Sequence, residues 1–175
     1  MAYAVTHVLI TIIILDLFRD YFLKKKFSTH LVLIGGVAGL LPDIDIIFTY
    51  IYNFIFKTQH NFHREFTHSF LFVFVFIFIG LVFFLLEKEK YAIFKKNISK
   101  RTIYLTFFIL AYGWFMHIAL DCFFAGDGLL TFIPRMPLSF CMHWFGTDFL
   151  IKLDAVILVL WLIHEEWKHK IKDYI

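Results

Sequence analysis

Cysteine is scarce in this chain of 175 residues, with only Cys122 and Cys141 present. Their spacing matches neither a metal-binding nor a redox motif, so we expect both to pack rather than to carry chemistry. The net charge is only +3 and the basic residues stand in short clusters, so we expect no nucleic-acid partner. No internal repeat is evident, and the first apolar stretch lacks a small-residue cleavage site, so we expect no signal peptide.

Apolar residues, in contrast, are abundant. They make up 61% of the chain, which has 25 Phe and a mean hydropathy of +0.76. A soluble domain has about 45–50% apolar residues, so most of this chain has lipid as its solvent. The length allows about five spanning helices of roughly 20 residues each. The sequence therefore predicts an all-α integral membrane bundle, a single transmembrane helical domain over residues 1–175.

Five apolar segments predict the helices. They cover approximately residues 4–22, 31–56, 66–86, 103–124 and 149–164. The second contains Pro42 after a glycine-rich run, so we expect it to be broken or re-entrant there. The third is almost pure Phe, Ile, Val and Leu, which is the strongest spanning signal in the chain.

Three basic clusters set the expected orientation. They are residues 24–26, 88–101 and 168–172, and they fall on one side if all five segments span. Positive charge marks the cytoplasmic side. We therefore expect a protein of the plasma (cytoplasmic) membrane, with its N-terminus outside and its C-terminus in the cytoplasm.

Several ionisable residues occur at a common depth inside the apolar segments. Counting 1.5 Å per residue from the cytoplasmic boundaries places six of them in the outer half of the bilayer or at its margin. They are His7, Asp43, Asp45, His68, His117 and Asp121. His117 and Asp121 share one helix face. Asp43 and Asp45 can serve one site only if the backbone unwinds near Pro42.

Each of these residues has a plainer interpretation when taken alone. A lone intramembrane histidine such as His117 is more often a packing residue, Asp43 or Asp45 could cap a helix, and Arg64 and His63 could be interfacial anchors. The combination of imidazoles and carboxylates instead favours a metal centre near the extracytoplasmic side. These ligands suit one or two divalent ions, Zn²⁺ first, with Mn²⁺ or Fe²⁺ as alternatives.

We expect no functional role for two further groups of ionisable residues. The first group should face water or pair with one another, and the second should be solvated or packed. Near the cytoplasmic end of the first segment, the first group is Asp16, Arg19 and Asp20. In the loops and the tail, the second group is His143, His164 and His169.

Four sequence blocks between residues 6 and 134 resemble a known family. THVLI, GLLPDID, HREFTHS and HIALDCFFAGDGLLTFIP are similar to the YdjM-type family of predicted membrane-bound metal-dependent hydrolases. Their order more distantly resembles zinc-dependent phospholipases C and P1-type nucleases. The resemblance implies a shared functional set, which is His7, Asp43, Asp45, His63, Arg64, His68, His117 and Asp121.

The leading hypothesis is a metal-dependent hydrolase that cleaves a phosphoester in a lipid or lipid-linked substrate. Asp121 is the first candidate for a bridging carboxylate, and Arg64, or else Arg135, would clamp phosphate oxygens. Whichever of Asp43 and Asp45 is not a ligand would orient a histidine or act as general base.

The alternative is a non-enzymatic membrane protein that binds a metal or a regulatory partner, for which the loop at residues 87–101 would be the docking surface. A permease is poorly supported, because the third and fourth segments carry almost no polar residues on the cytoplasmic side.

Overall fold

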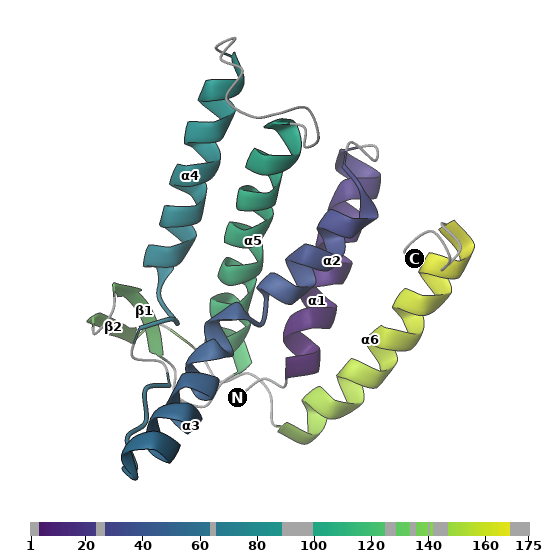
Figure 1. Cartoon of the computed structure of the whole chain (residues 1–175). Helices are drawn as coiled ribbons and strands as arrows, with labels where there is room; N and C mark the ends of the chain where they lie inside the picture. Colours follow the sequence, from purple (N-terminus) through teal and green to yellow (C-terminus); the bar gives the residue numbers. More distant parts are fainter. Residues whose placement is uncertain are drawn as a thin grey trace.

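The computed structural model of the chain describes residues 4–23, 27–63, 66–88, 100–124, 129–133, 136–139, 141 and 147–168. It is a helical bundle with a small hairpin (Figure 1). The helices are α1 (Ala4–Leu17), α2 (Thr29–Ala38), α3 (Ile44–Phe56), α4 (Phe70–Lys88), α5 (Lys100–Phe124) and α6 (Thr147–Lys168). A π-helical turn, Phe18–Phe22, follows α1, and a 3₁₀ turn, Leu41–Asp43, joins α2 to α3. Strands β1 (Leu129–Ile133) and β2 (Met136–Ser139) pair antiparallel.

The predicted helical membrane fold is confirmed. Helices α2 and α3 are the two halves of the second apolar segment, so the predicted break at Pro42 is present. By length and composition, Thr29–Phe56 and Arg101–Phe124 are each able to cross a membrane, and Phe70–Leu86 is a shorter apolar helix. The hairpin was not predicted, and α4 begins at Phe70 rather than near residue 66.

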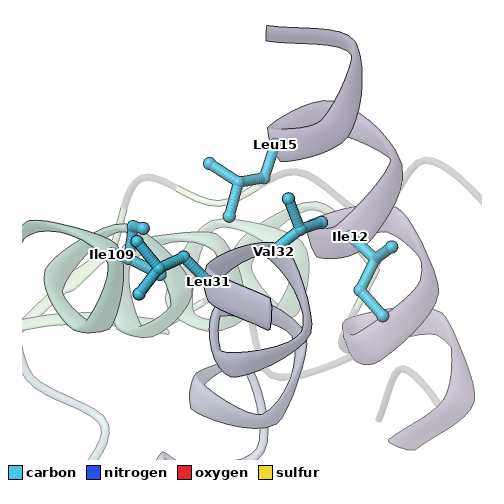
Figure 2. Packing of buried hydrophobic residues seen from close by; sticks show 5 residues of the cluster. All are labelled: Ile12, Leu15, Leu31, Val32 and Ile109. Carbon is cyan, nitrogen blue, oxygen red and sulfur yellow. The ribbon is translucent and has the colours of Figure 1, made fainter. Parts of the chain in front are cut away.

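The helices pack through two apolar clusters. In the first, α1, α2 and α5 meet at Ile12, Leu15, Leu31, Val32 and Ile109 (Figure 2). The second lies between α4 and α5 and consists of Val73, Ala111, Trp114 and Ile118. Large apolar side chains cover much of the outer surface, among them Phe54 and Phe78. This inside-and-outside apolar pattern is typical of a helix bundle that faces lipid.

The described helix ends next to the lysine clusters lie together. The end of the π-helical turn, the end of α4, the start of α5 and the end of α6 all point toward the upper side of Figure 1. We call this the basic end. The start of α1, the end of α5 and the hairpin lie at the opposite end, which we call the hairpin end (Figure 1).

The two cysteines form a disulfide between Cys122 and Cys141. The expectation that they only pack was therefore wrong. The physical reason is the hairpin: its antiparallel strands reverse the chain, so that Cys141 returns to the end of α5. The spacing of 19 residues gave no sign of this return.

Helix α3 carries a polar stripe, Asp45, Thr49 and Asn53, at every fourth residue. This stripe is bonded to the segment that follows the helix. The Asn53 amide donates to the His60 carbonyl at 2.7 Å, and Thr49 Oγ1 accepts from the Phe62 amide at 3.1 Å. The opposite face of α3 is apolar and exposed. Helix α3 and residues 58–63, 66 and 67 therefore form one arm, in which polar groups of the helix bond to the segment after it.

Glycine allows α2 and α5 to approach closely. A Cβ atom on Gly113 would lie 2.5 Å from the Ala38 Cβ and 2.7 Å from the Gly35 carbonyl oxygen. Small residues at such crossings are typical of membrane helices.

Replacing Gly113 with alanine is expected to push α2 away and to lower stability by about 1–3 kcal/mol, because the obstacle is largely backbone. Gly80→Ala is the control, since its Cβ would meet only the Phe108 ring, at 3.0–3.3 Å, and that ring can turn. Thermal unfolding of both variants in detergent measures the difference. Equal midpoints would contradict a backbone-limited contact at Gly113.

Candidate metal centre

The break between α2 and α3 supplies the first element of the centre. In a continuous α-helix the Gly39 carbonyl would accept from the Asp43 amide. Here the Asp43 amide bonds to the Leu40 carbonyl at 3.1 Å, so the Gly39 carbonyl faces the bundle instead. It lies 2.7 Å from His117 Nδ1. Because a carbonyl only accepts, Nδ1 carries the hydrogen and the Nε2 lone pair of a neutral His117 faces away from Gly39.

Asp45 holds two further histidines. Its Oδ1 lies 2.9 Å from His63 Nδ1, and its Oδ2 lies 3.2 Å from His68 Nδ1. Thr67 Oγ1 also donates to Oδ2, at 2.6 Å. A carboxylate draws the hydrogen of each ring to Nδ1 and leaves Nε2 as the free ligand atom. Asp45 is thus a positioning residue for His63 and His68.

The Nε2 atoms of His68 and His117 converge. They are 3.0 Å apart. Asp43 Oδ1 lies 3.3 Å from His68 Nε2 and 3.5 Å from His117 Nε2. With both hydrogens held at Nδ1, these two nitrogens present lone pairs to each other and to a carboxylate. Such an arrangement is unfavourable unless a proton or a cation lies among them.

His7 and Asp121 complete the group. The His7 ring stacks on His117 with ring centroids 4.0 Å apart, and its Nε2 lies 3.4 Å from Asp121 Oδ1. Asp121 Oδ2 lies 3.6 Å from His68 Nε2 and 3.7 Å from His117 Nε2. The two oxygens of Asp121 therefore face different histidines.

The donor atoms form two adjacent triads. Within each triad, one donor atom from every residue lies within 4.8 Å of the others. The triads are His7, His117 and Asp121, and Asp43, His63 and His68. His63 Nε2 is a buried atom with no hydrogen-bond partner among the described residues. Imidazole nitrogens and carboxylate oxygens in this arrangement could hold one or two divalent ions.

All seven predicted metal-ligand candidates come together at the hairpin end. They are His7, Asp43, Asp45, His63, His68, His117 and Asp121. Arg64, the third predicted catalytic residue, lies outside the described residues, as do Arg135, His143 and His169. Helix α4 begins late because Thr67 and His68 turn toward Asp45.

Sequence reasoning missed two polar contributors, the Gly39 carbonyl and the Thr67 hydroxyl. A glycine three residues before Pro42 was the available signal for the first. Gly39 also permits α1 to lie close to the end of α2, since a Cβ on Gly39 would lie 3.3 Å from the His7 carbonyl oxygen.

The structure distinguishes between the two expectations for the polar residues at the basic end. Asp16 and Arg19 are buried rather than solvated. Arg19 pairs with both Asp16 and Asp20, which confirms the expected pairing. His164 is half-buried and contacts Glu165, a residue that sequence reasoning did not single out.

Comparison with known proteins agrees with the motif blocks. The model of the YdjM inner membrane protein family matches residues 1–172. The chain belongs to this family. The YdjM family is described as one of inner membrane proteins, which places this chain in a membrane. No curated protein and no solved structure matches it.

We expect the purified YdjM-family protein to bind Zn²⁺, and we expect His117→Ala to remove most of that binding because His117 contacts both triads. Asp45→Asn should weaken affinity by about 10–100-fold without removing a ligand atom, since it loosens two histidines. Metal titration monitored by mass spectrometry or emission spectroscopy measures both. His30→Ala, which changes an exposed histidine, is the control. Unchanged binding in His117→Ala would contradict the centre.

Proposed function

We propose that this YdjM-family protein is a membrane-embedded, metal-dependent hydrolase that cleaves a phosphoester in a lipid or lipid-linked substrate. The observation that supports it best is the pair of histidine Nε2 atoms 3.0 Å apart with Asp43 beside both. This arrangement of lone pairs and carboxylates fits a cation better than a packing role.

The proposed ligands are His7, His117 and Asp121 of one triad and His63 and His68 of the other. Asp121 is the candidate to bridge the triads, because its Oδ1 faces His7 and its Oδ2 faces His68. Zn²⁺ suits the histidine-rich set, with Mn²⁺ or Fe²⁺ as alternatives. A divalent ion held here would lower the pKa of a coordinated water toward neutrality and would polarise a phosphoester.

The two aspartates of the broken helix have different proposed roles. Asp43 is the most open carboxylate of the centre, with 27% of its side chain exposed against 6% for Asp45. We assign Asp43 to the substrate side, where it would accept the proton of the attacking water as general base. Asp45 acts through His63 and His68 and does not touch substrate. Arg64 is assigned to the phosphate oxygens, because a guanidinium binds them with paired hydrogen bonds.

The lipid assignment follows from the surroundings of the centre. Two exposed apolar residues of the α3 arm directly adjoin polar residues of the centre in the chain: Ile44 follows Asp43, and Phe66 precedes Thr67. An amphiphilic substrate would place its acyl or prenyl chain against these side chains and its phosphate at the histidines. The centre at the hairpin end then lies at the level of the headgroups.

Asp43→Asn should lower kcat by about 10²–10⁴-fold while metal content remains close to normal, because it removes a proton acceptor. His117→Ala should abolish turnover, and His30→Ala should leave it unchanged. The assay is phosphate or headgroup release by Zn²⁺-loaded protein in mixed micelles, with a panel of phospholipids and polyprenyl phosphoesters. Metal-loaded protein that hydrolyses none of them would overturn the reaction and favour a non-enzymatic metal-binding or regulatory protein.

The proposed orientation has the hairpin end outside and the basic end in the cytoplasm. Lysines flank the helix ends at the basic end, as the positive-inside rule expects. The Cys122–Cys141 disulfide lies at the hairpin end, and disulfides persist in oxidising compartments outside the cytoplasm.

Single cysteines test this orientation. Gln59→Cys, beyond the end of α3, should react with a membrane-impermeant maleimide in intact cells. Ser28→Cys, before α2, should react only after lysis. Both positions are exposed, and Cys122 and Cys141 are bonded to each other. The reverse labelling pattern would invert the topology.

A further inference from the structure

A second group of ligating side chains lies at the basic end. Asp16 on α1 and His164 and Glu165 on α6 place one donor atom each within 4.8 Å of the others. Asp16 and Glu165 are both 1% exposed. The group is distinct from the first centre, because Asp16 follows His7 by nine residues on the same helix, a rise of about 14 Å.

The contacts inside this group leave one imidazole nitrogen available. His164 Nδ1 lies 3.1 Å from Glu165 Oε1, and the carboxylate draws the ring hydrogen to Nδ1. His164 Nε2 is buried and has no hydrogen-bond partner among the described residues. It is therefore an available ligand atom on a residue whose other ring nitrogen contacts one of the two buried carboxylates.

The close placement of several carboxylates in this group also favours a cation. Arg19 Nη2 lies 3.0 Å from Asp16 Oδ1 and 2.9 Å from Asp20 Oδ1. One guanidinium therefore faces these two aspartates, and Glu165 adds a third carboxylate beside Asp16. Ionised carboxylates inside a membrane protein cost several kcal/mol unless they are neutralised. A divalent ion would bind these carboxylates and would also use the nitrogen of His164, which a guanidinium would not.

We propose that Asp16, His164 and Glu165 form a second divalent-cation site at the basic end, which fastens α6 to α1. This proposal is independent of the reaction at the hairpin end.

The second site would affect how firmly α6 is held against α1. Helix α6 packs along α1, and Thr6 donates to Asp154 at 2.8 Å near the hairpin end. Much of the remaining α6 surface is exposed and apolar, including Val159 and Trp167. An ion shared by Asp16 and Glu165 would supply the second fixed point, eleven residues further along α6. Occupancy of this site should therefore control how tightly α6 is docked.

The experiment compares the bound metal of variants at two neighbouring glutamates, Glu165 and Glu166. The full-length protein is purified in detergent and titrated with Zn²⁺ or Mn²⁺ alone. Glu165→Gln should lower the bound metal by about one ion per chain, both in the natural sequence and in a His117→Ala background. Glu166→Gln, an exposed neighbour on the same helix, should leave it unchanged. His164→Gln, at a half-buried position, tests the same site if Glu165→Gln does not fold.

Hydrogen exchange of residues 147–168 gives the second measurement. When the free metal concentration is about ten times the Kd, amide exchange that requires α6 to open should slow by about tenfold in the natural sequence and in Glu166→Gln. It should not slow in Glu165→Gln. Metal content that is the same in Glu165→Gln and Glu166→Gln would overturn the proposal. It would assign the group to salt bridges or to a shared proton. Loss of hydrolase activity has no bearing on either measurement.

Discussion

The hydrogen bond between His117 Nδ1 and the Gly39 carbonyl is the contact on which the first centre depends. Inside a membrane a carbonyl released from its helix must find another partner. The 3₁₀ turn before α3 releases it by moving the Asp43 amide to Leu40. His117 then satisfies the carbonyl and, in doing so, directs its Nε2 toward His68 and Asp43. This hydrogen bond thus satisfies the carbonyl that the helix break releases, and it also orients a candidate ligand.

The same break separates the roles of the two aspartates. On a regular helix, side chains two residues apart point in nearly opposite directions. Asp43 is the last residue of the 3₁₀ turn and faces the Nε2 atoms, whereas Asp45 lies in the first turn of α3 and faces the Nδ1 atoms of His63 and His68. One carboxylate therefore adds charge to the centre while the other fixes its geometry. Thr49 and Asn53 extend this support along the arm.

Much of this arrangement could be predicted because the depth of a residue in a spanning helix increases by a constant amount with each position in the sequence. A constant rise per residue places His7, Asp43 and His117 at one level once the basic boundaries are known. What could not be predicted depends on backbone that leaves the helix. Because the chain turns at Thr67, α4 begins only at Phe70. The hairpin brings Cys141 next to Cys122. The placement of Asp16 next to Glu165 was missed because Glu165 lies beyond the expected end of the fifth segment.

The placement of the two polar groups bears on transport. A path for ions or polar solutes requires polar side chains along its whole length. On α1, Ile12 lies between His7 and Asp16, and it packs with Val32 and Ile109 in the apolar cluster of Figure 2. This cluster fills the level between the two groups at the junction of α1, α2 and α5. In the described part of the bundle an apolar cluster therefore separates the two polar groups, which disfavours a permease.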